Sequence, residues 1–227
     1  MNKQPWQALL AVAAVAMTAG SVNAATYAEI GDAGETLGTA AIADTQPGVS
    51  LDAIVGTLTA NNADLFQIYI SDPVTFSANT LFTTGVNNFD TSLFLFDAGG
   101  FGVYANDDAT GSQSALPAGD ALSPTTAGIY YIAISGSGFS PVSTDGPIFQ
   151  QPNGNTIPFN AVLSPTGVGG TKALSGWTGT SGSNAGAYRI NLTGATFVPE
   201  PTVSVFLPSL FALWGAASLK RRSRIKA

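Results

Sequence analysis

Short apolar runs separated by turn residues are the dominant pattern of this chain. The clearest example is FDTSLFLFDAGGFGVYANDD, where apolar residues 93–96 and 101–105 flank Asp97-Ala98-Gly99-Gly100. Glycine supplies the positive φ that tight turns require, so the stretch predicts a β-hairpin. Leucine and phenylalanine alternate in the first run, which makes both of its faces apolar. We therefore expect this strand in the middle of a packed sheet.

Further strands are predicted on both sides of the hairpin. Residues 128–135 are β-branched and aromatic without a breaker, and residues 61–64 form a turn. The glycine-rich segment 26–42 is interpreted as an extended lead-in with turns, and residues 137–186 as a long loop, functional or partly disordered. Strands without intervening helices indicate an all-β antiparallel β-sandwich over residues 25–197. The other expected strands are 51–58 (interrupted at Gly56), 65–70, 74–82 and 187–193.

The first 24 residues have the layout of a signal peptide. Lys3 precedes an uncharged apolar run at residues 8–17, and Val22-Asn23-Ala24 fits the small-x-small cleavage pattern. The alternative is a membrane anchor that stays in place. The run is short for a membrane span and ends in a processing site, which favours an N-terminal signal helix that is cleaved after Ala24.

The C-terminal segment, residues 198–227, has a different character. Residues 202–219 carry no charge, and a basic cluster follows directly at residues 220–226. Eighteen residues suffice for a C-terminal transmembrane helix, and the basic cluster would stay on the cytoplasmic side. A buried core helix is the alternative, but it would not end in five positive charges.

Composition narrows the possible chemistry. The 227 residues include no cysteine and no histidine, so disulfides, thiol chemistry and the commonest general base are excluded. Only 10% of the residues are charged, whereas 26 are glycine. This balance is typical of an exported all-β protein with many turns.

The charge of the body excludes one class of partner. Thirteen of the fourteen acidic residues lie there, but only two basic ones, Lys172 and Arg189, which leaves a net charge of about −11. Such a surface repels phosphate backbones and attracts cations. Nucleic acid is therefore not an expected partner.

Acidic residues around the hairpin suggest a calcium site. Asp90 precedes the first strand, and Asn106, Asp107 and Asp108 follow the second, so strand pairing would bring the two groups to one end. Calcium prefers oxygen ligands of this kind. The alternative is that Asn-Asp-Asp only forms a turn with its own backbone. A second oxygen cluster, at Glu29, Asp32 and Glu35, is a further candidate.

The sequence contains no clear catalytic motif. The nucleophile pattern Gly-x-Ser-x-Gly does not occur, although Asp107 with Asp90 or Asp64 could supply the two carboxylates of a glycosidase. We therefore expect no enzyme activity. Five aromatic residues are interpreted as core residues, with a sugar-stacking platform as the alternative: Tyr104, Tyr130, Tyr131, Trp177 and Tyr188.

The tail resembles the PEP-CTERM sorting signal of Gram-negative bacteria. The matching parts are Pro199-Glu200-Pro201, the apolar span, and Arg221-Arg222, in that order. The resemblance implies export, membrane retention and processing near the Pro-Glu-Pro motif by an exosortase. It also implies a place in the cell envelope or outside the cell, with extracellular polysaccharide or biofilm matrix.

The body resembles bacterial pre-peptidase C-terminal (PPC-like) β-sandwich domains, related to the jelly roll. The matching stretches are residues 64–68, 89–96, 106–108 and 128–134. The resemblance implies a non-catalytic domain that binds calcium or polymeric ligands. We therefore expect a non-catalytic envelope protein; the alternatives are a calcium-dependent polysaccharide-binding module and a polysaccharide-cleaving enzyme.

Overall fold

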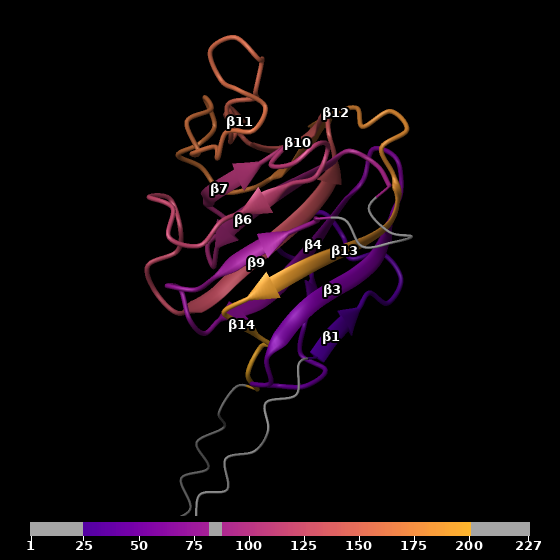
Figure 1. Ribbon diagram of the computed structural model, residues 1–227, viewed down its shortest axis with the longest axis vertical. Coiled ribbons are helices and arrows are strands. Elements are labelled where there is room, and N and C mark those ends of the chain that lie inside the picture. The colour runs from indigo at the N-terminus through magenta and orange to yellow at the C-terminus, as the bar shows by residue number, and fades with distance from the viewer. Residues whose placement is uncertain (1–24, 82–87, 201–227) are drawn as a thin grey trace, which may run out of the picture.

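A computed structural model describes residues 25–81 and 88–200, which form an all-β body of fourteen strands (Figure 1). The all-β prediction is confirmed. Within the described residues, no helix is long and apolar enough to cross a membrane. The expected signal peptide and the apolar part of the sorting tail lie outside the described residues.

A six-stranded sheet forms the centre of the body. In this sheet β6 lies between β9 and β7, as the pattern of the hairpin predicts, and β4 lies on the other side of β9. Its strands are β14 (Ala195–Thr196), β4 (Ala63–Ile70), β9 (Gly128–Gly136), β6 (Thr91–Asp97) and β7 (Gly102–Asn106), with β2 (Ala41–Ile42) also paired to β4.

A five-stranded sheet packs on one face of this central sheet. Its strands, in order, are β1 (Ala25–Ala28), β3 (Leu51–Leu58), β13 (Gly186–Thr193), β5 (Ser77–Asn79) and β8 (Ala115–Leu116). Most pairs are antiparallel as predicted, but β1 runs parallel to β3, and β2 runs parallel to β4. In both pairs a strand of the other sheet intervenes in the sequence: β2 lies between β1 and β3, and β3 lies between β2 and β4.

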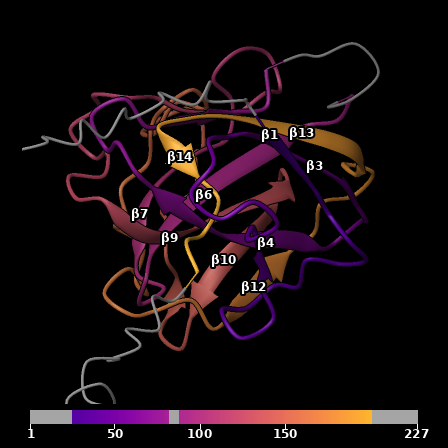
Figure 2. The same ribbon diagram turned by 90° about the horizontal axis from the view of Figure 1, so that it is seen from below.

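A third layer covers the opposite face, where the sequence predicts only a long loop. Part of segment 137–186 forms a three-stranded sheet of β11 (Gly146–Pro147), β10 (Phe139–Ser143) and β12 (Gly176–Gly179). Figure 2 shows the central sheet between this layer and the five-stranded sheet. The prediction of an irregular loop is wrong for these strands. β11 is only two residues long, and β10 pairs with β12 across a long separation in sequence, so neither pairing produces a periodic pattern in the local sequence.

The alternation in β6 explains the three layers. Leu93 and Leu95 belong to the core between the two larger sheets, as do Tyr130 and Tyr188. Phe94 and Phe96 point the other way and pack against residues of the third layer, including Phe149. The ring centroids of Phe94 and Phe149 are 5.7 Å apart. Both faces of the strand are therefore buried, as predicted.

Three strands differ in part from the prediction, although the bounds of β3 (Leu51–Leu58) are as expected. β3 continues through Gly56 without interruption, and β4 begins at Ala63, inside the expected turn. Of the expected strand at 74–82, only β5 forms within the described residues; Asp72 accepts hydrogen bonds from the backbone of Val74 and Thr75 and holds a turn there. A local turn of this kind competes with the sheet for backbone donors.

The two described ends of the body lie side by side. The Ala25 amide donates to the Ser50 carbonyl at 3.2 Å, and Ser50 also forms a β-bridge with Thr196. β14 pairs with Tyr69 and Ile70, the last residues of β4. Asp64, near the start of β4, therefore lies at the end of the sheet remote from both described chain ends.

Phe149→Ala tests whether the third layer is part of the folded core. Phe149 is fully buried, so its truncation should lower the free energy of unfolding by about 3–5 kcal/mol, measured by urea denaturation. Phe159, which is 50% exposed, provides the control, and Phe159→Ala should change stability by about 0.5 kcal/mol or less. Equal small effects of both substitutions would contradict the packing described above.

Candidate functional site

Three carboxylates converge at the end of the central sheet remote from the chain ends. Glu29 directly follows β1, Asp32 follows three residues later, and Asp64 is the second residue of β4. One carboxylate oxygen from each lies within 4.8 Å of those of the other two. We call these three residues the acidic triad. It combines two members of a predicted cluster with a residue for which the sequence predicts a turn.

Asp64 is the unusual member of the triad. Its side chain is 0% exposed, and neither carboxylate oxygen has a hydrogen-bond partner. Side chains alternate along a strand, so Asp64 lies on the same face of β4 as the core residues Phe66 and Ile68. A buried carboxylate without a partner is costly, and a bound ion is one arrangement that would offset this cost.

The surroundings of Asp64 favour its neutral form when no cation is bound. Burial, followed by the negative charge of Glu29, raises the pKa of Asp64 to about 7. The Tyr188 hydroxyl lies close enough to oppose this shift in part. Burial also raises the pKa of Tyr188 itself, so this phenol stays protonated. A divalent cation would therefore compete with a proton for Asp64 near neutral pH.

Glu29 is fixed in place by three donors. Its Oε1 accepts a hydrogen bond from the Ala33 amide at 3.0 Å. Its Oε2 accepts one from the Thr57 amide at 2.9 Å and one from the Tyr188 hydroxyl at 3.3 Å. Each carboxylate oxygen can accept more than one partner, so these bonds orient Glu29 and still leave it able to bind a cation.

The segment that carries Asp32 is tied to the start of β4. Asp32 Oδ1 accepts from Asn62 Nδ2 at 2.9 Å, and Glu35 Oε1 accepts from the Ala63 amide at 3.3 Å. Burial, with a smaller contribution from the charge of Asp32, raises the pKa of Glu35. Glu35 therefore flanks the acidic triad and adds a fourth carboxylate beside it.

Gly56 makes room for the triad. This residue pairs with Tyr188 across β3 and β13. A Cβ atom at Gly56 would overlap both Glu29 Oε2 and the Tyr188 hydroxyl. The glycine that suggested an interrupted strand is instead needed for the close approach of these two side chains.

The residues of the triad fit a divalent cation. Calcium binds oxygen ligands at about 2.3–2.6 Å, so two ligands of one ion are at most about 5 Å apart. The spacing of 4.8 Å or less in the triad meets this limit. All donors are oxygens, and the chain has no cysteine or histidine that would favour a softer metal.

The residues predicted around the hairpin are arranged differently. Asn106 is buried, and its side chain is engaged at both ends: Nδ2 donates to the Ala161 carbonyl, and Oδ1 accepts from the Ala115 amide. Asp107 accepts hydrogen bonds from the Ser92 and Ser137 hydroxyls. These contacts give Asn106 and Asp107 structural roles whether or not an ion binds beside them.

Asp90 and Asp108 lie close enough to Asp107 for its negative charge to raise their pKa values. Burial and the charges of Asp107 and Asp108 raise the pKa of Asp90 to about 6, and burial and Asp107 raise that of Asp108. Each has one buried oxygen without a hydrogen-bond partner. Among the described residues, however, only the acidic triad brings three carboxylates within 4.8 Å, so the hairpin site stays a prediction.

Part of the sorting motif is described. The amides of Phe197 and Val198 donate to the carbonyls of Val49 and Ala43, which holds the chain on the body directly before the motif. Pro199 and Glu200 line a shallow hollow next to these residues. The remaining residues of the motif lie outside the described residues: Pro201, Arg221 and Arg222.

Sequence reasoning misses Asp64 as part of a cluster, although a signal is present. The apolar pattern places Phe66, Ile68 and Ile70 on one face of the expected strand. Continuing their period of two residues backwards leads to Asp64, an acid on an apolar face. No comparable pattern links Asp64 to Glu29, because the two meet only in the folded chain.

Comparison with known protein families, curated proteins and solved structures finds no match to this chain.

Gly56→Ala tests the close approach at the triad. The added methyl group must displace Glu29 or Tyr188, so we expect a loss of about 1–3 kcal/mol in the free energy of unfolding, measured by urea denaturation. At Gly38 a Cβ atom would meet no other atom within 4 Å, and Gly38→Ala should be nearly neutral. If Gly56→Ala is equally harmless, the geometry of the triad is wrong.

Proposed function

We propose that the protein is an exported, non-catalytic envelope protein whose PPC-like β-sandwich binds calcium at Glu29, Asp32 and Asp64. The observation that carries this proposal is the fully buried Asp64 carboxylate, which has no hydrogen-bond partner and faces two further carboxylates. A bound cation would neutralise these charges and link the segment after β1 to β4.

Calcium is preferred over magnesium for two reasons. Calcium accepts irregular arrangements of six to eight oxygens, whereas magnesium requires nearly ideal octahedral geometry. The triad, with Glu35 beside it, offers carboxylates from two separate segments of the chain and no complete octahedral set. Extracellular calcium modules often bind with dissociation constants of about 10⁻⁴–10⁻³ M, which suits a protein outside the cytoplasm.

The proposed location depends on the two ends of the sequence. The N-terminal leader would direct export, and the PEP-CTERM-like tail would retain the protein in the membrane until an exosortase processes it. Association with extracellular polysaccharide is part of this proposal. The proposed location is supported by the order of the motif, the apolar span and the basic cluster in residues 199–226.

A polysaccharide-cleaving enzyme is less well supported. The chain lacks histidine, and a glycosidase would need two carboxylates in contact with a polymer. Asp64 is 0% exposed, which argues against a pair formed by Asp64 and Asp107.

Calcium should raise the melting temperature of the purified protein by more than NaCl of equal ionic strength does. A ligand at a hundred times its dissociation constant stabilises the folded state by about 2.7 kcal/mol. Asp64→Asn keeps the size of the side chain and removes its charge, so it should abolish the specific gain. Asp145, an exposed acid, is the control, and Asp145→Asn should leave the gain intact.

The same scan distinguishes the two acidic clusters. If calcium binds at the hairpin, the double substitution Asp90→Asn and Asp107→Asn should abolish the gain, and Asp64→Asn should not. We expect the reverse. An equal shift from NaCl in all variants would indicate only screening of a negative surface and would contradict both sites.

The metal-free protein should lose stability as the pH rises. Because the pKa of Asp64 is raised in the folded state to about 7, the folded chain binds this proton more tightly than the unfolded chain does. The resulting stability is present below about pH 4 and is lost by pH 7, up to about 4 kcal/mol. Urea denaturation in a chelator at pH 5 and pH 7.5 should show this loss in the wild type and a smaller loss in Asp64→Asn.

Cell fractionation tests the proposed location. The protein should appear in the envelope or outside the cell with its first 24 residues removed. Full-length protein with an intact N-terminus in the cytosol would contradict the proposal.

A further inference from the structure

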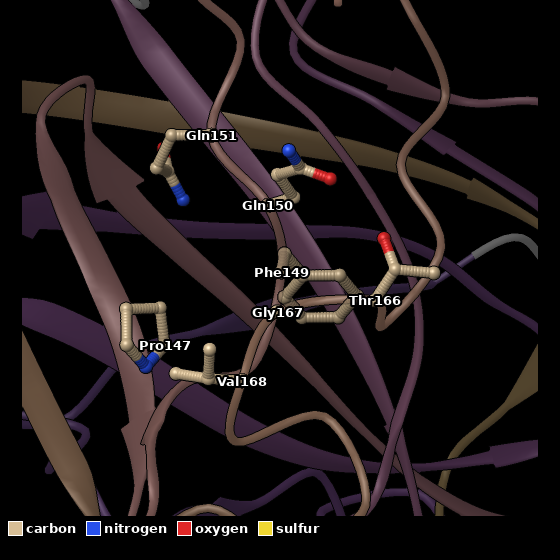
Figure 3. Close-up of a pocket in the computed structure, with 7 residues that line it drawn as sticks. All are labelled: Pro147, Phe149, Gln150, Gln151, Thr166, Gly167 and Val168. Carbon is tan, nitrogen blue, oxygen red and sulfur yellow. The ribbon is translucent and has the colours of Figure 1, made fainter.

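A second feature, separate from the acidic triad, lies on the third layer. It is a pocket of about 330 Å³ between the chain that follows β11 and the segment around Val168 (Figure 3). Figure 3 shows the amides of Gln150 and Gln151 on one side of the pocket and Pro147 and Val168 on the other. None of the residues that line it is charged.

Backbone hydrogen bonds join two of the segments that line the pocket, residues 147–148 and residues 167–169. The Gly167 amide donates to the Ile148 carbonyl at 3.0 Å, and the Gly169 amide donates to the Pro147 carbonyl at 2.9 Å. A Cβ atom at Gly167 would overlap the Pro147 carbonyl. Only glycine allows the two segments to lie this close, so the backbone fixes this side of the pocket.

The polar groups of the pocket are available to a ligand. Gln150 and Gln151 are exposed, and their side-chain amides make no hydrogen bond within the described residues. Each amide offers two donors and one acceptor. Thr166 adds a hydroxyl, whose one internal contact, to the Ser164 carbonyl, is long at 3.5 Å.

The opposite side supplies carbon surface. Val168 is 78% exposed, Pro147 presents its ring, and the buried Phe149 also lines the pocket. A sugar ring has this dual character, because its C–H groups pack on apolar side chains while its hydroxyls both donate and accept hydrogen bonds. Small-molecule sites combine apolar walls with a few polar groups in the same way.

Charge narrows the choice of ligand. The body carries a net charge of about −11, which disfavours anionic ligands, and the pocket has no acid to hold a cation. The exposed position of Gln150, Gln151 and Val168 leaves the pocket open to a polymer. We propose that this pocket binds one neutral pyranoside unit of a polysaccharide, with the Gln150 and Gln151 amides on its hydroxyls.

This inference deepens the proposed association with polysaccharide and does not depend on calcium. The test uses the full chain, isotope-labelled and purified in a detergent without a sugar head group. Cellotetraose, maltotetraose and mannotetraose are titrated, with tetragalacturonate as the acidic comparison. We expect at least one neutral probe to shift the side-chain NH₂ signals of Gln150 and Gln151, and to do so equally with and without a chelator.

The double substitution Gln150→Ala and Gln151→Ala should weaken this binding by about tenfold or more, since each lost ligand hydrogen bond costs affinity. Gln46→Ala, at an exposed glutamine that does not line the pocket, should leave it unchanged. Three outcomes overturn the inference: no shift with any neutral probe, equal binding by the double variant, or stronger binding of tetragalacturonate. None of these outcomes bears on calcium binding, which is tested separately by melting temperature.

Discussion

Burial of both faces of the central sheet is the constraint on which the rest of this structure depends. A sheet covered on one side only could leave its second face to water. Here Phe94 and Phe96 on the second face of β6 require cover, and segment 137–186 supplies it. The same arrangement creates both candidate sites. The five-stranded sheet brings Tyr188 and Gly56 over Asp64, and the third layer forms the pocket beside Gln150.

The sequence predicts the parts of the fold that are encoded locally. Alternation over a few residues identifies β6, β7 and β9, and it also assigns Leu93 and Phe94 to opposite buried faces. The third layer has no such signal, because its strands are short and its longest pairing joins β10 to β12 across a long separation in sequence. Its stability comes from contacts such as Phe94 with Trp177, whose ring centroids are 5.4 Å apart. Contacts of this kind are set by tertiary packing.

The candidate sites also combine features that the local sequence predicts with features that only tertiary packing sets. Charge density alone indicates that acids cluster, and Glu29 and Asp32 do lie together. Charge density does not show which of these acids is the best candidate ligand. Burial decides which carboxylate lacks hydrogen-bond partners, and burial is a property of the folded chain. Asp64 joins the triad from β4, 32 residues after Asp32. Asn106, by contrast, has the right chemistry for a ligand but uses its amide to hold neighbouring backbone.

The adjacency of Ala25 and Thr196 has a consequence for the acidic triad. Ser135 of β9 pairs with Ala63 on one side and Ser92 on the other, so both acidic groups share the end remote from the described chain ends. The eight residues of β4 span up to about 26 Å. In physiological salt the Debye length is about 8 Å. A charged surface placed against the described chain ends would therefore be screened from the triad, and the ions that reach the triad would be those of the surrounding medium.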